Sequence, residues 1–187
     1  RVMCIEIMGN KAGWLTLYSG LAGGADIILI PEIPYDIDSV MHAIEKRARK
    51  GRPFSIIAVA EGAMSVAESK LKKKERQQQR AKQGQTTATQ LIANEIKERS
   101  SYETRVVISG HIVRGGSPSA YDRVLATQFG AYAAELISKE IFGVTVAMRN
   151  NVVTHNQLSD IAGITKFVPQ DNQMLSVARS MGISLGD

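Results

Sequence analysis

The stretch Thr104-Arg-Val-Val-Ile-Ser-Gly-His-Ile-Val-Arg-Gly-Gly-Ser-Pro118 leads from an apolar segment through glycines into a Ser-Pro pair. Its first part is rich in β-branched residues, which predicts a buried strand at residues 104–109. Ser117 can accept hydrogen bonds from the free amides at the start of a helix, and Pro118 suits the first helical position. We therefore expect a strand, a glycine turn and a helix that continues to about residue 142.

The same alternation of strand and helix extends along the rest of the chain. The expected strands are apolar throughout rather than alternating, which is typical of parallel strands covered on both faces. We expect an α/β fold with a mainly parallel sheet and helices on both faces. The other expected strands are residues 2–8, 26–30, 54–60 and 144–148, and the other expected helices are residues 12–21, 36–50, 64–82, 86–99 and 171–181.

The composition is that of a folded globular protein, since 44% of the 187 residues are hydrophobic and 22% are charged. The lone cysteine, Cys4, excludes an internal disulfide framework, fits a reducing compartment such as the cytoplasm, and is expected to be inert packing. No apolar run reaches the roughly 20 residues that a transmembrane helix needs, so we expect no membrane association. The chain begins with Arg1 rather than Met, and we expect it to be a piece of a longer protein.

The net charge of +5 is concentrated in residues 70–85, a segment rich in lysine, arginine and glutamine. Nucleic-acid-binding surfaces usually combine positive charge with aromatic side chains that stack on bases, and this segment has no aromatic residue. The pattern favours a solvated helix and argues against a nucleic-acid partner. An interaction module that works through this basic helix is the alternative.

Polar residues follow several of the expected strands at the carboxyl edge of the sheet, where open α/β sheets bind ligands. Met8 and Gly9 follow the first strand, Glu61 follows the third, and a glycine-rich loop with His111 and Arg114 follows the fourth. Glycines allow close backbone approach, a helix start attracts anions, and guanidinium and imidazole groups donate to phosphate. A carboxylate can accept hydrogen bonds from sugar hydroxyls. These residues therefore predict a pocket for a sugar phosphate.

Each of these residues also has a purely structural interpretation. Arg114 could pair with Asp122, and His111 could be a buried core histidine. Glu61 could be the negative charge at the N-terminus of the next helix. Taken together, a histidine, an arginine and two glycines between a strand and a helix start favour the anion pocket.

The sequence offers no metal site and no catalytic pair. The histidines are scattered, and no acidic cluster has the spacing of metal ligands. No pair of a nucleophile and a base is evident, so we assign no catalytic residue within this chain.

Three stretches carry a resemblance to a known family. They are Glu6-Ile-Met-Gly-Asn-Lys-Ala-Gly-Trp14, Gly23-Gly-Ala-Asp-Ile-Ile-Leu-Ile-Pro-Glu32 and Gly110-His-Ile-Val-Arg-Gly-Gly-Ser-Pro-Ser-Ala-Tyr-Asp-Arg-Val-Leu-Ala126. They resemble the 6-phosphofructokinase family, the last stretch most specifically. The resemblance covers almost the whole chain and corresponds to the C-terminal half or more of a bacterial-type subunit.

The resemblance implies an enzyme that transfers a phosphoryl group to O1 of fructose 6-phosphate and so forms fructose 1,6-bisphosphate in glycolysis. Matched by motif, His111 and Arg114 bind fructose 6-phosphate, His111 at its 6-phosphate. Met8, Gly9 and Glu61 line the sugar.

Two further arginines, Arg1 and Arg105, match family positions that reach into the site of the neighbouring subunit. The resemblance therefore implies a homo-oligomer, either a homodimer or a homotetramer, in which each site needs two chains. It also implies a cytoplasmic enzyme.

Three departures from the family bear on function. Asn10 stands where the family has an arginine after Met-Gly, which removes a guanidinium near the transferring phosphoryl group. The segment that contains the basic helix is longer than in short bacterial members, and we interpret about 66–99 as a peripheral helical insertion. The N-terminal half, with the donor site for ATP or pyrophosphate, the Mg²⁺ and the aspartate base, is absent. We therefore expect the chain alone to be inactive, and a non-catalytic phosphosugar- or nucleotide-sensing subunit is the alternative function.

The resemblance also implies a division of the chain. Residues 1–112 with about 163–187 would form the fructose 6-phosphate-binding domain, and about 113–162 would pack on the missing donor domain. Asp26, Lys50 and Arg52 match an effector site of bacterial members, but a solvated helix end explains the two basic residues equally well.

Overall fold

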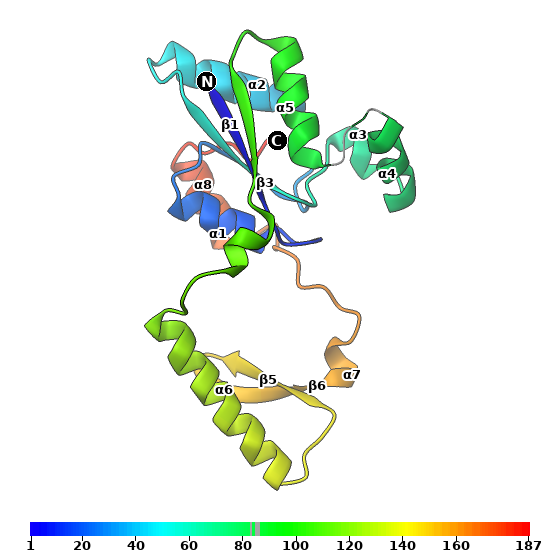
Figure 1. Ribbon diagram of the computed structural model, residues 1–187, viewed down its shortest axis with the longest axis vertical. Coiled ribbons are helices and arrows are strands. Elements are labelled where there is room, and N and C mark those ends of the chain that lie inside the picture. The colour runs from blue at the N-terminus through cyan, green and yellow to red at the C-terminus, as the bar shows by residue number, and fades with distance from the viewer. Residues whose placement is uncertain (83, 85–86) are drawn as a thin grey trace. The chain divides into compact units, whose positions relative to one another are not determined.

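The computed structural model describes residues 1–82, 84 and 87–187 of the chain. The chain forms two compact units, Arg1–Ile112 with Lys166–Asp187, and Val113–Thr165. The first unit holds a parallel sheet with its helices, and the second holds a long helix and a two-stranded hairpin (Figure 1).

Four parallel strands form the sheet of the first unit, in the order β2-β3-β1-β4. Their apolar sequences predict this arrangement, and the α/β fold class is confirmed. β1 lies between two neighbours, whereas β4 is an edge strand. The strands are β1 (Val2–Ile7), β2 (Ile27–Leu29), β3 (Ser55–Ala60) and β4 (Thr104–Ile108).

The register brings the ends of three strands to one edge. Ile7 of β1 pairs with Ala60 of β3, and Glu6 pairs with Ile108 of β4. Because the strands are parallel, the residues that follow them leave the sheet at this carboxyl edge, and the residues that precede them lie at the opposite edge.

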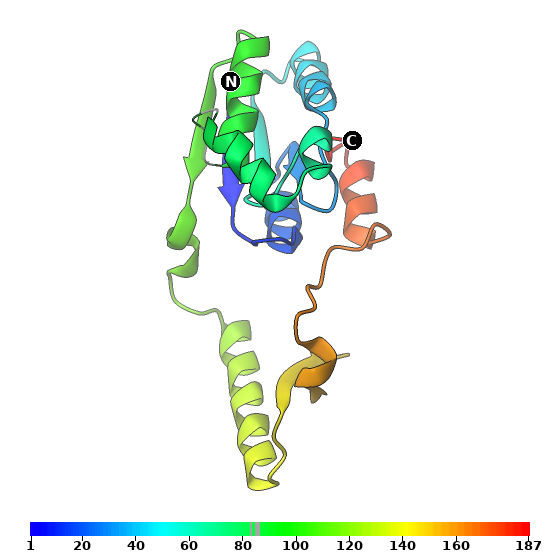
Figure 2. The same cartoon turned by 90° about the vertical axis from the view of Figure 1, so that its right-hand side faces the viewer.

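Helices cover both faces of the sheet (Figure 2). On one face, α2 (Ile37–Arg49) and α5 (Ala88–Arg99) cover a core that includes the fully buried Ile57. On the other face, α1 (Trp14–Ala22) and α8 (Gln173–Ser180) cover a separate core. The apolar sides of these helices therefore cover both faces of the central strands β1 and β3, although the residues of β1 on the second face are only partly buried.

Cys4 lies in the core beneath α2 and α5, with none of its surface exposed. Burial raises the pKa of its thiol to about 12, because the thiolate would lose its hydration. The thiol therefore stays protonated and unreactive at neutral pH, which agrees with its expected role as packing.

The helix predicted over residues 64–82 is interrupted in the structure. Ser65 caps a single turn, α3 (Val66–Ser69), in a capping box with Glu68. The longer helix α4 (Lys73–Lys82) follows and has no buried residue. The basic segment is thus helical, as predicted, but it forms two helices and not one.

The next helix was predicted to begin at Thr86, which lies outside the described residues. α5 begins at Ala88 after Thr87, whose side chain accepts a hydrogen bond from the Gln90 amide. Ala88, Ile92 and other residues of α5 belong to the core. α5 therefore packs on the sheet and is not peripheral, whereas the extent of the insertion expected over about 66–99 stays a prediction.

The second unit differs from the sequence prediction at its strands. β5 (Val144–Arg149) does not join the parallel sheet but pairs antiparallel with β6 (Val152–Gln157), a strand that we did not predict. Asn150 and Asn151 between them have φ values of 51° and 62°. Hairpin turns of type I′ need positive φ at both central residues, and asparagine tolerates it. The Asn-Asn pair is the signal that we missed.

The long helix of this unit, α6 (Ala120–Ser138), begins later than predicted. Its cap is Ser119 and not Ser117, because the Ser119 side chain accepts from the Asp122 amide while Asp122 accepts from the Ser119 amide. A short helix, α7 (Leu158–Ile161), follows the hairpin. Within the described parts of the chain, no helix combines the length and the apolar character needed to span a membrane.

Candidate functional site

The carboxylate of Glu61 joins the loops that follow β1 and β3. Its Oε1 atom accepts hydrogen bonds from the backbone amides of Gly9 at 2.9 Å and Asn10 at 2.5 Å. Two amides from one loop therefore hold a negative charge at the carboxyl edge of the sheet. Among the described residues, none donates to Oε2, so this oxygen can still accept hydrogen bonds from a ligand.

Two glycines make this contact possible. Gly9 has a φ of 155°, and a Cβ atom there would lie 2.6 Å from the Ala12 carbonyl oxygen. A Cβ atom on Gly62 would lie 2.3 Å from the Asn10 carbonyl oxygen. The lack of a side chain at Gly62 therefore lets the two loops approach each other, and the lack of one at Gly9 lets its own loop turn back toward Ala12.

Asn10 has a φ of 55°, in the left-handed region that asparagine adopts more easily than arginine. The backbone at this position thus gives a local reason for an amide side chain where the family pattern has a guanidinium. Asn10 lines the cavity described below without adding a charge to it.

The proposal that Glu61 serves as the charge at the start of a helix is wrong. The helix that follows begins only at Val66, and Ser65 is its cap. Glu61 is exposed and its hydrogen bonds go to the other loop.

A cavity of about 900 Å³ opens at this edge of the sheet. The loops after β1, β2 and β3 form its floor, and α4 lines it from another side. Glu61 is the one residue of the predicted sugar site that lines this cavity. Representative lining residues are Asn10, Lys11, Glu32, Met64, Arg76 and Phe167.

Glu32, which also lines the cavity, has a structural role that sequence reasoning missed. Its carboxylate accepts from the amide of Gly13, which caps α1, and from the amide of Val168. Its own carbonyl accepts from the side chain of Gln170 at 2.8 Å. Glu32 therefore ties the start of α1 to the segment that returns to the sheet before α8.

His111 lies in a short 3-10 helix, η1 (Gly110–Arg114), directly after β4. It is exposed, so the interpretation as a buried core histidine is wrong. Its position after β4 places it at the same edge of the sheet as Met8 and Gly9.

Arg114 is the last residue of η1 and the second residue of the second unit. The alternative that it pairs with Asp122 is also wrong, because Asp122 accepts instead from the hydroxyl and the amide of Ser119. These hydrogen bonds lower the pKa of Asp122. No ion pair among the described residues includes Arg114.

Arg1 and Arg105 share a partner at the opposite edge of the sheet. Both donate to the carboxylate of Glu103, from Arg1 Nε at 2.9 Å and from Arg105 Nε at 2.8 Å. Arg105 and Arg1 together lower the pKa of Glu103. Arg1 precedes β1 and Arg105 is the second residue of β4, so both lie at the amino ends of their strands. The structure thus separates these two arginines from Glu61 and brings them to each other.

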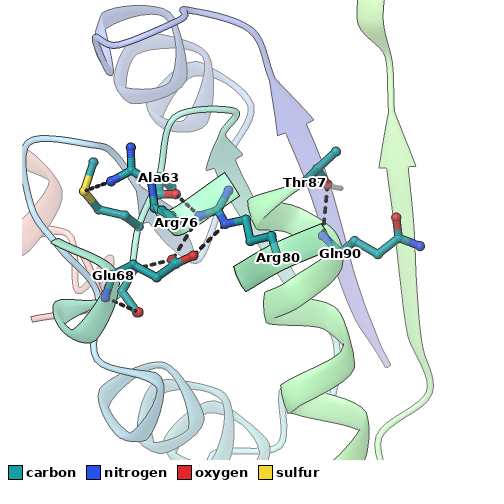
Figure 3. A network of polar contacts seen from close by, with 8 residues as sticks. Ala63, Glu68, Arg76, Arg80, Thr87 and Gln90 are labelled. Atoms are coloured by element: carbon teal, nitrogen blue, oxygen red, sulfur yellow. Dashed lines mark hydrogen bonds and ion pairs between the residues drawn. The ribbon is translucent and has the colours of Figure 1, made fainter. Parts of the chain in front are cut away.

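Arg80 attaches α4 to the rest of the first unit (Figure 3). Its Nε and Nη2 atoms lie 2.6 and 2.9 Å from the two carboxylate oxygens of Glu68, and Nη2 also donates to the Ala63 carbonyl. The side chains of Arg80 and Glu68 are only 11% and 8% exposed. Burial alone would raise the pKa of Glu68, but hydrogen bonds from Arg80 and Ser65 and the charge of Arg76 together lower it.

Removal of one partner of this pair should release α4. We expect Glu68→Gln to weaken the attachment of α4 by about 3 kcal/mol, because it leaves the largely enclosed Arg80 charge unpaired. Since the pKa of Glu68 is lowered in the folded state, its contribution is present above about pH 4.3 and is lost as the pH falls through the folded pKa. Amide exchange of α4 measures both effects, and Glu98→Gln on α5 is the exposed control. Equal exchange in the Glu68→Gln variant and the parent protein would show that the pair does not hold α4.

The structure also shows a second cavity, of about 620 Å³, that includes Asp26, Lys50 and Arg52. Asp26 already forms an ion pair with Arg47 at 2.8 Å and accepts from the Ile56 amide. This geometry gives Asp26 a role in the fold, and we do not assign an effector to the cavity.

A family model described as phosphofructokinase matches residues 1–137. The chain belongs to the phosphofructokinase family. The resemblance seen in its three sequence stretches is therefore confirmed.

A curated relative agrees with this assignment. The chain is 48% identical over 187 residues to the ATP-dependent 6-phosphofructokinase of Spirochaeta thermophila, a match that covers 100% of this chain and 51% of that protein. The chain spans about half the length of the curated relatives that it matches.

Solved phosphofructokinase structures share the fold. The enzyme of Saccharomyces cerevisiae superposes with a TM-score of 0.68 at 28% identity, over 86% of this chain and 20% of that chain. The pyrophosphate-dependent enzyme of Marinobacter aquaeolei gives 0.71 at 22% identity, over 98% of this chain and 48% of that chain, which shows the fold alone.

Proposed function

We propose that the phosphofructokinase to which this chain belongs transfers a phosphoryl group to O1 of fructose 6-phosphate, and that residues 1–187 supply the acceptor site. The observation that carries the proposal is the Glu61 carboxylate, which two backbone amides hold at the rim of a cavity with one oxygen free. The name of the Spirochaeta thermophila relative supports the reaction, and ATP as its donor.

In this proposal the residues of the chain bind and orient the acceptor. Glu61 Oε2 accepts from hydroxyls of the sugar, and Met8 and Gly9 give an apolar side chain and a bare backbone against which the ring lies. His111 and Arg114 donate to the 6-phosphate. Phosphoryl transfer depends mainly on such positioning and on charge stabilisation, so an ordered acceptor accounts for a large part of the rate.

The chemical step itself needs a phosphoryl donor, a metal ion and a base, and we assign none of these to residues of this chain. The O1–P bond forms while the bond between phosphorus and the donor's bridging oxygen breaks, and the proton of O1 passes to a base. Among the described residues, no three His, Cys, Asp or Glu side chains gather as metal ligands. We propose that the metal, the donor and the base are supplied by the part of the longer protein that this chain does not cover.

Arg1 and Arg105 are proposed to serve the site of a second copy. Met8 lies seven positions after Arg1 along β1, which corresponds to about 23 Å of strand. An arginine side chain cannot span that distance to the site of its own chain. Their exposure, and the single shared carboxylate of Glu103, leave both guanidinium groups able to donate to a phosphate across an interface. This proposal requires a homodimer or a homotetramer.

The second unit is proposed to pack on the donor half. Among its described residues Leu136 is the one buried hydrophobic side chain, whereas large apolar side chains are exposed. Two strands and a helix with so small a core are rarely stable alone. The exposed side chains include Tyr121, Val124, Ile137, Phe142 and Val152.

The test is an assay of the full-length protein with fructose 6-phosphate and either ATP or pyrophosphate, with the product followed by phosphorus NMR. We expect fructose 1,6-bisphosphate from one of the two donors, and none from residues 1–187 alone. Full-length protein that binds the sugar phosphate but turns over neither donor would support a sensing subunit and contradict the proposal. We propose that a glycolytic enzyme of this kind works in the cytoplasm.

A further inference from the structure

The basic helix α4 forms part of the cavity that holds Glu61. Lys73, Arg76 and Arg80 of this helix line the cavity, and Lys11 lines it from the loop after β1. The sequence suggested a solvated helix, and α4 indeed has no buried residue. Its placement nevertheless brings three basic side chains to the rim of the candidate site.

The acidic residues around the cavity are already engaged. Glu32 and Glu61 each accept two or more hydrogen bonds from backbone amides. Glu68 neutralises Arg80. The carboxylates near α4 are therefore used to hold the fold together.

Within the described part of the chain, the remaining cations form no ion pair of their own, although the charge of Arg76 helps to lower the pKa of Glu68. Among the described residues, no ion pair includes Lys11, Lys73 or Arg76. Cations that share a concave, partly enclosed surface attract anions more strongly than isolated surface charges do, because the low-dielectric walls focus their field. The cavity therefore has an excess of positive charge on the side formed by α4.

A hydrogen bond orients the Arg76 side chain but uses only one of its donors. Its Nη1 atom lies 3.2 Å from the thioether sulfur of Met64, which is a weak acceptor (Figure 3). Arg80, four residues further along, lies on the same side of α4 and anchors it through Glu68. The ion pair thus holds the helix so that the other donors of Arg76 stay available for a ligand.

We propose that Arg76 and Lys73 bind a phosphoryl group of the ligand in this cavity, distinct from the 6-phosphate assigned to His111 and Arg114. A planar guanidinium and a lysine ammonium are the usual partners of a phosphate dianion. The ligand class is therefore a sugar with two phosphoryl groups, and α4 takes the second one. This inference rests on the proposed function of the same site.

The test compares two sugars by calorimetric titration of the full-length protein. In the double variant Lys73→Gln/Arg76→Gln, we expect the affinity for fructose 1,6-bisphosphate to fall by about 30-fold, because two charge-assisted contacts are lost. The affinity for fructose 6-phosphate should change by less than about threefold, because that ligand lacks the group that α4 binds. Arg76→Lys keeps the charge and should recover part of the loss.

Lys74→Gln is the matched control, since Lys74 is exposed on the same helix and does not line the cavity. An equal loss for both sugars, an unchanged affinity for the bisphosphate, or the same loss in Lys74→Gln would each overturn the inference. If the parent protein binds neither sugar, the proposed function fails instead. Titration with inorganic phosphate then decides the inference separately: saturable binding that the double variant loses supports an anion site on α4, and no binding overturns it.

Discussion

Replacement of Glu61 by alanine in the full-length protein is expected to lower kcat/KM for fructose 6-phosphate by about 1,000-fold. Each hydrogen bond to a charged acceptor contributes about 1.5–3 kcal/mol, and the free oxygen of Glu61 can accept two of them from sugar hydroxyls. The loss should appear mainly in KM, since Glu61 binds the acceptor and takes no proton in the transfer. Steady-state kinetics with the sugar phosphate varied at saturating donor measures it.

Two further variants separate binding from folding. Glu61→Gln keeps an oxygen that can accept from the amides of Gly9 and Asn10 but removes the charge, so its loss should be smaller. Glu98→Ala, an exposed acid on α5, should leave the kinetics unchanged. If Glu61→Ala retains the KM of the parent protein and melts at the same temperature, Glu61 does not contact the sugar.

The second large effect concerns Arg105, one of the two arginines at the amino edge of the sheet. Arg105→Ser and Glu61→Ala variants are each expected to lose nearly all activity at low substrate concentration. When the two variants are co-expressed, about a quarter of the parent activity should return, because half of the random dimers contain one site with both residues intact. The activity of the separated mixed dimer, identified by two different affinity tags, measures this recovery.

Activity can recover only if Arg105 serves the site of the other chain, as its distance from Glu61 across the sheet suggests. If Arg105 served the site of its own chain, every site in a mixed dimer would carry one of the two substitutions and no activity would return. Lys97→Ser, at an exposed position of α5, is the control and should remain active by itself. Absence of recovery in a stable mixed dimer would contradict the shared site.

The parallel sheet could be predicted from the sequence because its strands are mainly apolar and do not alternate between apolar and polar residues. That signal is local, and it does not depend on which strands are neighbours. The hairpin of β5 and β6 escaped prediction for the opposite reason: its strands are half-buried, and the deciding feature is the positive φ at Asn150 and Asn151. The late start of α6 has a similar cause, since Ser117 and Ser119 are equally plausible caps by sequence and the Asp122 partner selects the second.

The candidate site was predictable in its position and only partly in its contacts. Strand order and direction bring Glu61 and Gly9 to one edge of the sheet, as expected from their place after strands. The hydrogen bonds between them could not be predicted, because they depend on the close approach that Gly62 permits. The role of α4 was missed because a run of lysine, arginine and glutamine has no apolar stripe. Only the buried partner Glu68, twelve residues before Arg80, shows where the helix lies.

A crystal structure of the full-length protein with fructose 6-phosphate tests the central claim most directly. We expect Glu61 Oε2 within hydrogen-bond distance of hydroxyls of the sugar, and His111 beside its 6-phosphate. A sugar phosphate bound elsewhere, with Glu61 still in contact only with its two amides, would contradict the account.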